Sequence, residues 1–315
     1  MKAAIINEFG PAEVLEISEV QKPVANDDQV LIKVKATGIN PVDTKVRAGT
    51  SGISKQISLP AIIGWDVSGM IETVGKNVSG FKTGDEVFGC IGFPSLGTTY
   101  AEFTLANPQL LANKPRNISF DEAAAIPLAG LTAYQAINEE LKVSSGQKIL
   151  IQAAAGGVGH LAVQFAKLNG ATVIGTASEK NEKFLKSLGI DKVIDYTRKK
   201  FEDIVHDADA VLDAVGGEVL YRSISCVKRG GVVVCLPSST KNDPKAIEIA
   251  AEKEVKLIWP MMRTDGEQMR LIARLMEEKK LKVKVDKIFT LDQIVWAHKA
   301  IETHKTDGKV VVRID

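Results

Sequence analysis

A glycine-rich run in the middle of the chain, Ala154–Gly159, follows an apolar segment and precedes a helical pattern. Strand, loop and helix in this order are the context that a dinucleotide-binding fingerprint requires. A missing side chain at Gly156 would let the backbone approach a pyrophosphate, and Gly159 would let the helix pack closely on the strand. Ala154 stands where the pattern has its first glycine, which is tolerable if its backbone conformation is ordinary. The alternative is a simple tight turn. The predicted cofactor contacts in this loop are Gly156, Gly157, Val158 and Gly159.

The choice between the two nicotinamide cofactors depends on the end of the next strand, roughly 20 residues beyond the loop. The chain reads GTASEK there, over Gly175–Lys180. Ser178 can hydrogen-bond a 2′-phosphate and Lys180 can neutralise it, whereas a carboxylate would repel it. We therefore predict NADPH, with Thr176, Ser178 and Lys180 as contacts. Glu179 leaves NADH open, because a different loop conformation would bring its carboxylate to the ribose.

Two textures divide the chain. Up to about residue 120 it is rich in Gly, Pro and β-branched runs with a period near two, such as 29–35 and 69–75, which is typical of a mostly antiparallel sheet. From there to about residue 260, apolar strands alternate with helical patterns, which predicts βαβ units and a doubly wound parallel sheet of the Rossmann type. We expect an α/β protein with a mostly β substrate domain over 1–122 and a Rossmann domain over 123–262. The segment 263–315 is too short to fold alone and is expected to return to the first domain.

Length and composition exclude several classes of protein. The chain has 315 residues, of which 45% are hydrophobic and 25% charged, as in an average globular protein with room for about two domains. A net charge of +1 argues against nucleic acid as a partner, and no apolar stretch approaches the roughly 18 residues of a membrane span. The three cysteines have no C-x-x-C spacing, which argues against a disulfide framework. We expect a cytoplasmic protein with no signal peptide, no nucleic-acid partner and no membrane insertion.

Five further motifs accompany the glycine loop and extend over nearly the whole chain. They are ATGINPVD (36–43), GWDVSG (64–69), GDEVFG (84–89), PLAGLTAY (127–134) and GKVVV (308–312). Together they resemble the medium-chain dehydrogenase/reductase superfamily, specifically its zinc-free quinone oxidoreductase and enone reductase branch. The resemblance implies a GroES-like fold for the mostly β domain, a small quinone or enone as substrate, and a homodimer.

The resemblance also identifies the positions at which alcohol dehydrogenases of this superfamily bind zinc. Those enzymes have a cysteine where this chain has Asn40, a His-Glu pair where it has Trp65–Asp66, and a third ligand where it has Leu128. The four histidines offer no two-ligand spacing on one helix face, and we predict no metal. Zinc lowers the pKa of bound water from about 15.7 to about 7, so alcohol oxidation without it is improbable. A quinone or a conjugated enone is already electrophilic and needs only hydrogen bonds to the oxyanion that forms.

In zinc-free relatives the corresponding strand and loop face the nicotinamide, which implies Asn40, Asp43 and Lys45 as catalytic candidates. Asn40 would donate to the substrate oxygen, Lys45 would bind the cofactor ribose or deliver a proton, and Asp43 would orient its neighbours. The alternative is structural: Asn40 and Pro41 form a turn, Asp43 caps it, and Lys45 faces solvent.

Four more positions come with the resemblance. Thr132 would lie near the nicotinamide ribose, Tyr196 beside the adenosine 2′-phosphate, and Leu236 and Pro237 at the nicotinamide end. Tyr196 could equally be an ordinary packing residue. The expected function is therefore an NADPH-dependent, zinc-independent oxidoreductase that reduces quinones or α,β-unsaturated carbonyls by hydride transfer. A catalytically silent NADPH-binding structural or regulatory protein and a zinc alcohol dehydrogenase are the alternatives.

Overall fold

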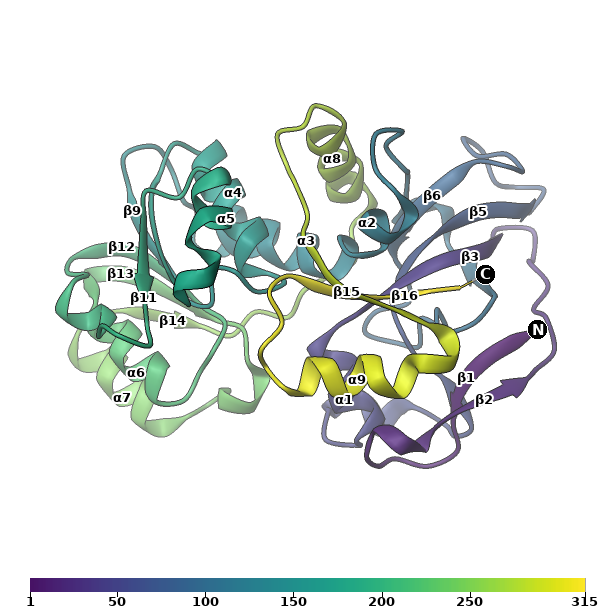
Figure 1. Ribbon diagram of the computed structural model, residues 1–315, viewed down its shortest axis with the longest axis horizontal. Coiled ribbons are helices and arrows are strands. Elements are labelled where there is room, and N and C mark those ends of the chain that lie inside the picture. The colour runs from purple at the N-terminus through teal and green to yellow at the C-terminus, as the bar shows by residue number, and fades with distance from the viewer. Residues whose placement is uncertain (315) are drawn as a thin grey trace. The chain divides into compact units, whose positions relative to one another are not determined.

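The computed structural model describes residues 1–314, and the chain divides into two compact units. Unit 1 comprises Met1–Leu131 and the C-terminal stretch that begins at Arg263, while unit 2 comprises Thr132–Met262. Helix α3 (Pro127–Gln135) contains the first division. The two ends of the chain therefore belong to the same unit, as the purple and yellow colours in Figure 1 show.

Unit 1 is mostly β structure. A seven-stranded sheet has the order β15-β16-β3-β5-β6-β8, with β7 also paired to β3, and a smaller sheet has the order β2-β1-β4. All pairs are antiparallel except β15 with β16, which agrees with the predicted mostly antiparallel sheet. The strands are β1 (Lys2–Ile6), β2 (Leu15–Glu19), β3 (Val30–Ile39), β4 (Ala61–Ile62), β5 (Asp66–Val74), β6 (Glu86–Cys90), β7 (Phe103–Ala106), β8 (Leu111–Asn113), β15 (Val285–Thr290) and β16 (Lys309–Arg313). The helices are α1 (Pro41–Arg47), α2 (Phe120–Ala124), α8 (Gly266–Glu277) and α9 (Ile294–Glu302).

The long strand β3 is the centre of unit 1. Its apolar residues are buried because it pairs with β5, β7 and β16 and because α2 packs over it. Small residues make the helix contact close: Ala36 of β3 and Val311 of β16 pack against Ala124 and Ala125. The C-terminal strand β16 is thereby part of the same core as the N-terminal motif 36–43.

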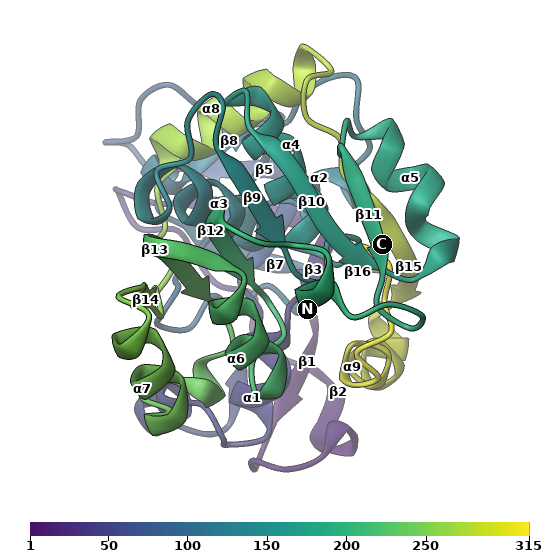
Figure 2. The ribbon, with the colours of Figure 1, turned by 90° about the vertical axis from the view of Figure 1, so that its left-hand side faces the viewer.

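Unit 2 is a six-stranded parallel sheet with the order β11-β10-β9-β12-β13-β14, which is the Rossmann order 3-2-1-4-5-6. Figure 2 presents this sheet, with helices on both of its faces. Its core is formed by apolar sheet residues, such as Leu150, Val211 and Val233, packed against α6 and α7. The predicted doubly wound parallel sheet is confirmed. The elements are β9 (Lys148–Ile151), α4 (Gly159–Leu168), β10 (Thr172–Ala177), α5 (Glu182–Ser187), β11 (Lys192–Asp195), β12 (Ala208–Asp213), α6 (Glu218–Ser225), β13 (Val227–Cys235), α7 (Pro244–Glu252) and β14 (Lys256–Ile258).

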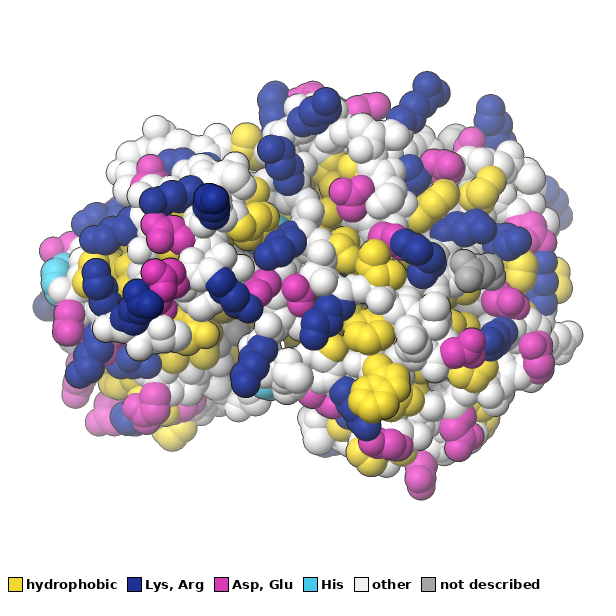
Figure 3. Space-filling view, viewed as in Figure 1, with side chains coloured by type: hydrophobic (Ala, Val, Ile, Leu, Met, Phe, Trp, Pro, Cys, Tyr) yellow, Lys and Arg dark blue, Asp and Glu magenta, His cyan; other side chains and the backbone are white. Residues whose placement is uncertain are grey.

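The surface carries charges of both signs. On the face drawn in Figure 3, Lys and Arg side chains intermingle with Asp and Glu side chains, in keeping with the net charge of +1. Within residues 1–314, every helix is too short or too polar to cross a membrane.

Candidate functional site

The glycine-rich loop lies between β9 and α4, in the predicted context. A Cβ added at Gly159 would overlap the carbonyl oxygen of Ala153 and lie 2.9 Å from Cα of Ala154, so only glycine lets α4 begin here. A Cβ added at Gly156 would meet a single atom, 3.2 Å away, which leaves that side of the loop open to a close ligand. The left-handed conformation falls on Ala153 (φ 51°), whereas Ala154 is not among the residues with positive φ. The loop therefore fits a dinucleotide pyrophosphate. Gly157 and Val158, which belong to the same loop, are half-buried.

Thr176 supports this loop from inside β10. Its buried hydroxyl donates to Oε1 of Gln152 (2.6 Å) and accepts from the N–H of Ala153 (3.1 Å). The backbone carbonyl of Thr176 accepts from the N–H of Ala154 at 2.9 Å. These bonds hold the first turn of the loop, so Thr176 shapes the predicted cofactor site from within.

A buried polar chain that the sequence analysis missed continues from Gln152. Nε2 of Gln152 donates to Oγ of Ser223 (3.0 Å), whose hydroxyl donates to Oδ2 of Asp213 (2.8 Å). Oδ1 of Asp213 accepts from the N–H groups of Val215 and Gly216. Burial raises the pKa of Asp213, and these donors counter the shift. These hydrogen bonds join the carboxyl ends of β9, β10 and β12. The one sequence signal that could have identified these residues is the occurrence of polar side chains at the ends of apolar strands.

The ends of β10 and β11 form the predicted 2′-phosphate region. Ala177 is paired with Asp195, so the residues that follow, Ser178 and Tyr196, extend from neighbouring strands. Lys180 is exposed, and Tyr196 is 62% exposed, which argues against its being an ordinary core residue. Oγ of Ser178 accepts from Nδ2 of the nearby Asn181 at 3.3 Å.

Glu179, the residue that left NADH open, is held by an ion pair. Its Oε2 lies 2.7 Å from a guanidinium nitrogen of Arg198, whose Nε lies 3.6 Å from Oδ2 of Asp195. Arg198 is a further residue that the sequence analysis did not assign to the site. The signal that could have found it is a basic residue two positions after Tyr196.

The remaining cofactor candidates of unit 2 lie after the end of β13 and within α3. Leu236 and Pro237 directly follow β13 and are half-buried, and the N–H of Leu236 donates to the carbonyl of Asp213 (2.8 Å). Thr132 is half-buried on α3. In a parallel sheet the carboxyl ends of all strands lie at one edge, so Gly156, Ser178, Tyr196 and Leu236 share the edge at which Rossmann folds bind ligands.

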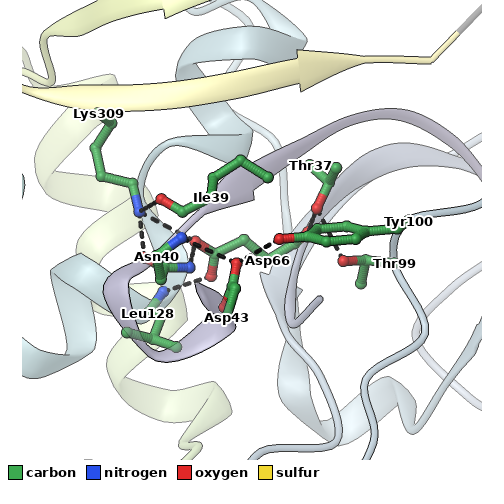
Figure 4. Close-up of polar contacts among 9 residues, drawn as sticks. All are labelled: Thr37, Ile39, Asn40, Asp43, Asp66, Thr99, Tyr100, Leu128 and Lys309. Carbon is green, nitrogen blue, oxygen red and sulfur yellow. Dashed lines mark hydrogen bonds and ion pairs between the residues drawn. The ribbon is translucent and has the colours of Figure 1, made fainter. Parts of the chain in front are cut away.

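In unit 1, three buried polar side chains meet at the start of α1 (Figure 4). Nδ2 of Asn40 donates to Oδ2 of Asp66 at 2.8 Å, and Oδ1 of Asn40 accepts from Nζ of Lys309. Nζ of Lys309 also donates to the carbonyl of Ile39 (3.2 Å) and lies 3.5 Å from Oδ2 of Asp66. Asn40, Asp66 and Lys309 are 1%, 0% and 3% exposed, respectively. We call them the Asn40–Asp66–Lys309 cluster.

Four of the motifs build this cluster, since Lys309 belongs to the motif 308–312. Gly38 makes room for it, because an added Cβ would lie 2.7 Å from Oδ2 of Asp66. Oδ1 of Asp66 accepts from the N–H of Leu128 at the start of α3 (2.7 Å). Burial raises the pKa of Asp66, while the Lys309 ammonium, the Asn40 amide and the Leu128 N–H counter the shift. The motifs 36–43, 64–69, 127–134 and 308–312 therefore converge on the Asp66 carboxylate.

Asp43 lies beside the cluster, fully buried. Its Oδ2 accepts from the backbone N–H of Asn40 (2.9 Å) and from the hydroxyl of Tyr100 (2.7 Å), whose oxygen lies 3.1 Å from Nε2 of His298. Asp43 thus caps α1, as the structural alternative predicts, and also orients its neighbours.

Burial raises the pKa of Asp43 to about 7, and the nearby Asp66 adds to the shift. Burial, with Arg47 adding to the effect, lowers the pKa of His298 to about 3.

Lys45 is not part of this arrangement. It lies half-buried in the last turn of α1, and none of the hydrogen bonds that join the described residues of the cluster involves its side chain. Tyr100, His298 and Lys309 were missed, because no local pattern marks residues whose partners lie far away in the sequence.

The zinc positions of alcohol dehydrogenases do not fit zinc in this chain. Among residues 1–314, no three His, Cys, Asp or Glu side chains are grouped so that they could hold a metal ion. The site offers one amide and one carboxylate, Leu128 is apolar, and the Lys309 ammonium would repel a dication. Trp65 is buried and donates through Nε1 to the carbonyl of Ser95 (2.6 Å).

Comparison with known proteins gives consistent matches over the whole chain. Residues 26–116 match the alcohol dehydrogenase GroES-like domain, and residues 188–312 match the zinc-binding dehydrogenase family model. The 2-methylene-furan-3-one reductase of Solanum lycopersicum is 38% identical over 99% of this chain and 79% of its own length. The solved structure of the quinone oxidoreductase from Coxiella burnetii has 39% sequence identity to this chain and a TM-score of 0.93, and the match covers 100% of this chain and 99% of that one. The Escherichia coli quinone oxidoreductase complexed with NADPH is 27% identical, with a TM-score of 0.88 over 99% of this chain and 100% of that one.

Proposed function

The chain belongs to the zinc-free quinone oxidoreductase branch of the medium-chain dehydrogenase/reductase superfamily, and we propose that it reduces quinones or α,β-unsaturated carbonyl compounds with NADPH. The observation that carries the proposal is the loop between β9 and α4. This loop follows the first strand of a sheet with the Rossmann strand order. Gly156 leaves one side of the loop open, and Gly159 lets α4 pack closely against it. Solved relatives include a quinone oxidoreductase complexed with NADPH.

The residues of unit 2 would hold the cofactor. The N–H groups of Gly157, Val158 and Gly159 at the start of α4 would bind the pyrophosphate, since a helix N-terminus favours an anion. The N–H of Gly156 already donates to the carbonyl of Ala153 (2.9 Å), so Gly156 would contribute the open space beside the loop. The 2′-phosphate would be bound by Ser178, Lys180 and Tyr196, with Glu179 neutralised by Arg198. The nicotinamide end would lie against Thr132, Leu236 and Pro237. When bound, NADPH supplies a hydride and is released as NADP⁺.

Unit 1 would stabilise the charge that develops on the substrate. As the hydride adds to the β-carbon of an enone, the C=C electron pair moves towards the carbonyl oxygen and gives an enolate. Asn40 carries a second Nδ2 hydrogen besides the one donated to Asp66, and this hydrogen would be donated to that oxygen. A proton from water or from Lys45 would then complete the α-carbon. Asp43 would keep Asn40 in place through its backbone N–H.

We also propose a homodimer and a cytoplasmic location. The dimer follows from family membership, and light scattering on the purified protein would test it. All three cysteines are buried and free, which suits a reducing compartment.

The reaction is tested by following NADPH oxidation with a panel of quinones, alkenals and cyclic enones. We expect one NADPH to be consumed for each substrate reduced, with NADH used more slowly. The Asn40→Ala variant should bind NADPH as the wild type does but turn over enones about 100-fold more slowly, the usual cost of losing one oxyanion donor. Tight NADPH binding without turnover on any compound would identify a silent binding protein instead. One tightly bound zinc per chain in metal analysis would identify an alcohol dehydrogenase.

A further inference from the structure

A buried lysine lies among the residues that correspond to a zinc site. Lys309 is 3% exposed, and its ammonium is surrounded by the oxygens of Asn40, Ile39 and Asp66. Burying a charged group is costly unless it is paired and hydrogen-bonded, so an ammonium in this position needs a compensating carboxylate, which Asp66 supplies. The cluster thus contains a fixed positive charge that does not depend on a metal.

The pairing of β16 with β3 places this charge beside Asn40. Val310 of β16 is paired with Ile39 of β3 in an antiparallel register, so Lys309 comes opposite Asn40. Gly308, directly before the lysine, has φ 115°, and an added Cβ would overlap the carbonyl oxygen of Lys284. A side chain at this position would therefore displace the start of β16. The GKVVV motif is explained by this requirement for glycine followed by the buried cation.

The two charges together fix the orientation of the Asn40 amide. An ammonium can only donate, so it must face Oδ1, and a carboxylate accepts, so it must face Nδ2. A flip of the amide would bring Oδ1 against a carboxylate and Nδ2 against an ammonium, and both contacts would be repulsive. The second Nδ2 hydrogen is then held in one direction, and it has no acceptor among the described residues.

We propose that Lys309 is a positioning residue for catalysis, which acts by locking the Asn40 amide so that its second N–H meets the substrate oxygen. The proposal rests on the proposed function, because it requires an oxyanion at that place. Lys309 itself does not touch the substrate. Its ammonium orients the donor and offsets the Asp66 carboxylate, which would otherwise oppose negative charge on the substrate.

The test uses a double variant, Asp66→Asn with Lys309→Met, in the full-length protein. Lys309→Met alone would leave a buried carboxylate unpaired and could prevent folding, whereas the double variant removes both charges. The amide that replaces the Asp66 carboxylate can accept from the Asn40 amide or donate to it, so the Asn40 amide is free to flip. We expect thermal unfolding to remain cooperative and the Kd for NADPH, measured by nicotinamide fluorescence, to change less than about twofold. The kcat for an enone should fall about tenfold, part of the value of a full oxyanion donor, with little change in KM.

A four-member cycle shows whether the Lys309–Asp66 pair acts through Asn40. The wild type, the double variant, Asn40→Ala and the triple variant are compared on the same enone. If Lys309, paired with Asp66, orients Asn40, the double change should reduce kcat in the wild type but not in the Asn40→Ala background. Equal losses in both backgrounds, or no loss in either, would overturn the proposal while leaving the reductase function intact. A wild type that reduces none of the panel compounds would overturn the function, and the proposal with it.

Discussion

Replacing His298 by glutamine should change how the stability of the protein depends on pH. The imidazole is buried on α9, its Nε2 lies 3.1 Å from the hydroxyl of Tyr100, and its Nδ1 has no partner within residues 1–314. Burial, together with the charge of Arg47, lowers its pKa to about 3 from the ordinary 6.5. Glutamine can still meet the tyrosine hydroxyl but cannot take up a proton.

The sign follows from proton binding in the two states. Between about pH 3 and pH 6.5 the unfolded chain is protonated at this histidine and the folded chain is not, so its contribution to the free energy of unfolding rises with pH. At about 1.36 kcal/mol per pH unit, the change from about pH 4.5 to about pH 6 is about 2 kcal/mol. Asp43 acts in the opposite direction, because its pKa is raised to about 7 and the folded chain keeps its proton up to that pH. The two contributions therefore oppose each other in the wild type, and only that of Asp43 remains in the variant.

Urea unfolding, followed by tryptophan fluorescence, measures the effect, since Trp65 is buried in the same unit. Between about pH 4.5 and about pH 6, the free energy of unfolding of the wild type should rise by about 2 kcal/mol relative to that of His298→Gln. His206 is exposed, so the His206→Gln variant is a suitable control and should follow the wild type at both pH values. A stability difference between wild type and His298→Gln that does not vary with pH would refute the reasoning.

Three further predictions concern the cofactor site. Gly159→Ala should lower the stability of the protein by about 1–3 kcal/mol in thermal unfolding, because its methyl group would overlap a backbone oxygen of the loop; unchanged stability would contradict the packing argument. Ser178→Asp with Lys180→Ala should shift the preference in kcat/KM from NADPH towards NADH, since it replaces a phosphate donor by a carboxylate and removes a cation; unaltered selectivity would count against the 2′-phosphate assignment. Arg198→Gln should raise the Kd for NADPH up to about fivefold in fluorescence titrations, the scale of one exposed ion pair, and adding Glu179→Gln should restore it. Failure of that restoration would show that Arg198 does not act through Glu179.

The elements of unit 2 could be predicted because their signals are local. Apolar runs of strand length, helical periodicity and glycines at the turn each lie within a few consecutive residues. The boundaries were less accurate. The sequence places the start of the loop at Ala154, whereas β9 already ends at Ile151, because Gln152 and Ala153 leave the strand to bond with Thr176 and form the loop.

The candidate site was predicted only in part, for a physical reason. Asn40 and Asp66 belong to short motifs and were identified, but the side chains that hold them were not. Lys309 is 269 positions from Asn40 along the chain, and His298 is 198 positions from Tyr100. No spacing rule links such residues, since their contacts depend on which strands pair and in which register.

The sequence by itself determined the Rossmann unit, the glycine loop and the absence of the usual zinc ligands, because these depend on residue type and local order. The tertiary structure alone decided that β16 pairs with β3, and hence that a buried ammonium faces the Asn40 amide. The tertiary structure also decided that Asp43 and His298 are buried away from solvent, because their burial results from the packing of distant segments. The electrostatics of the site is therefore a property of the fold.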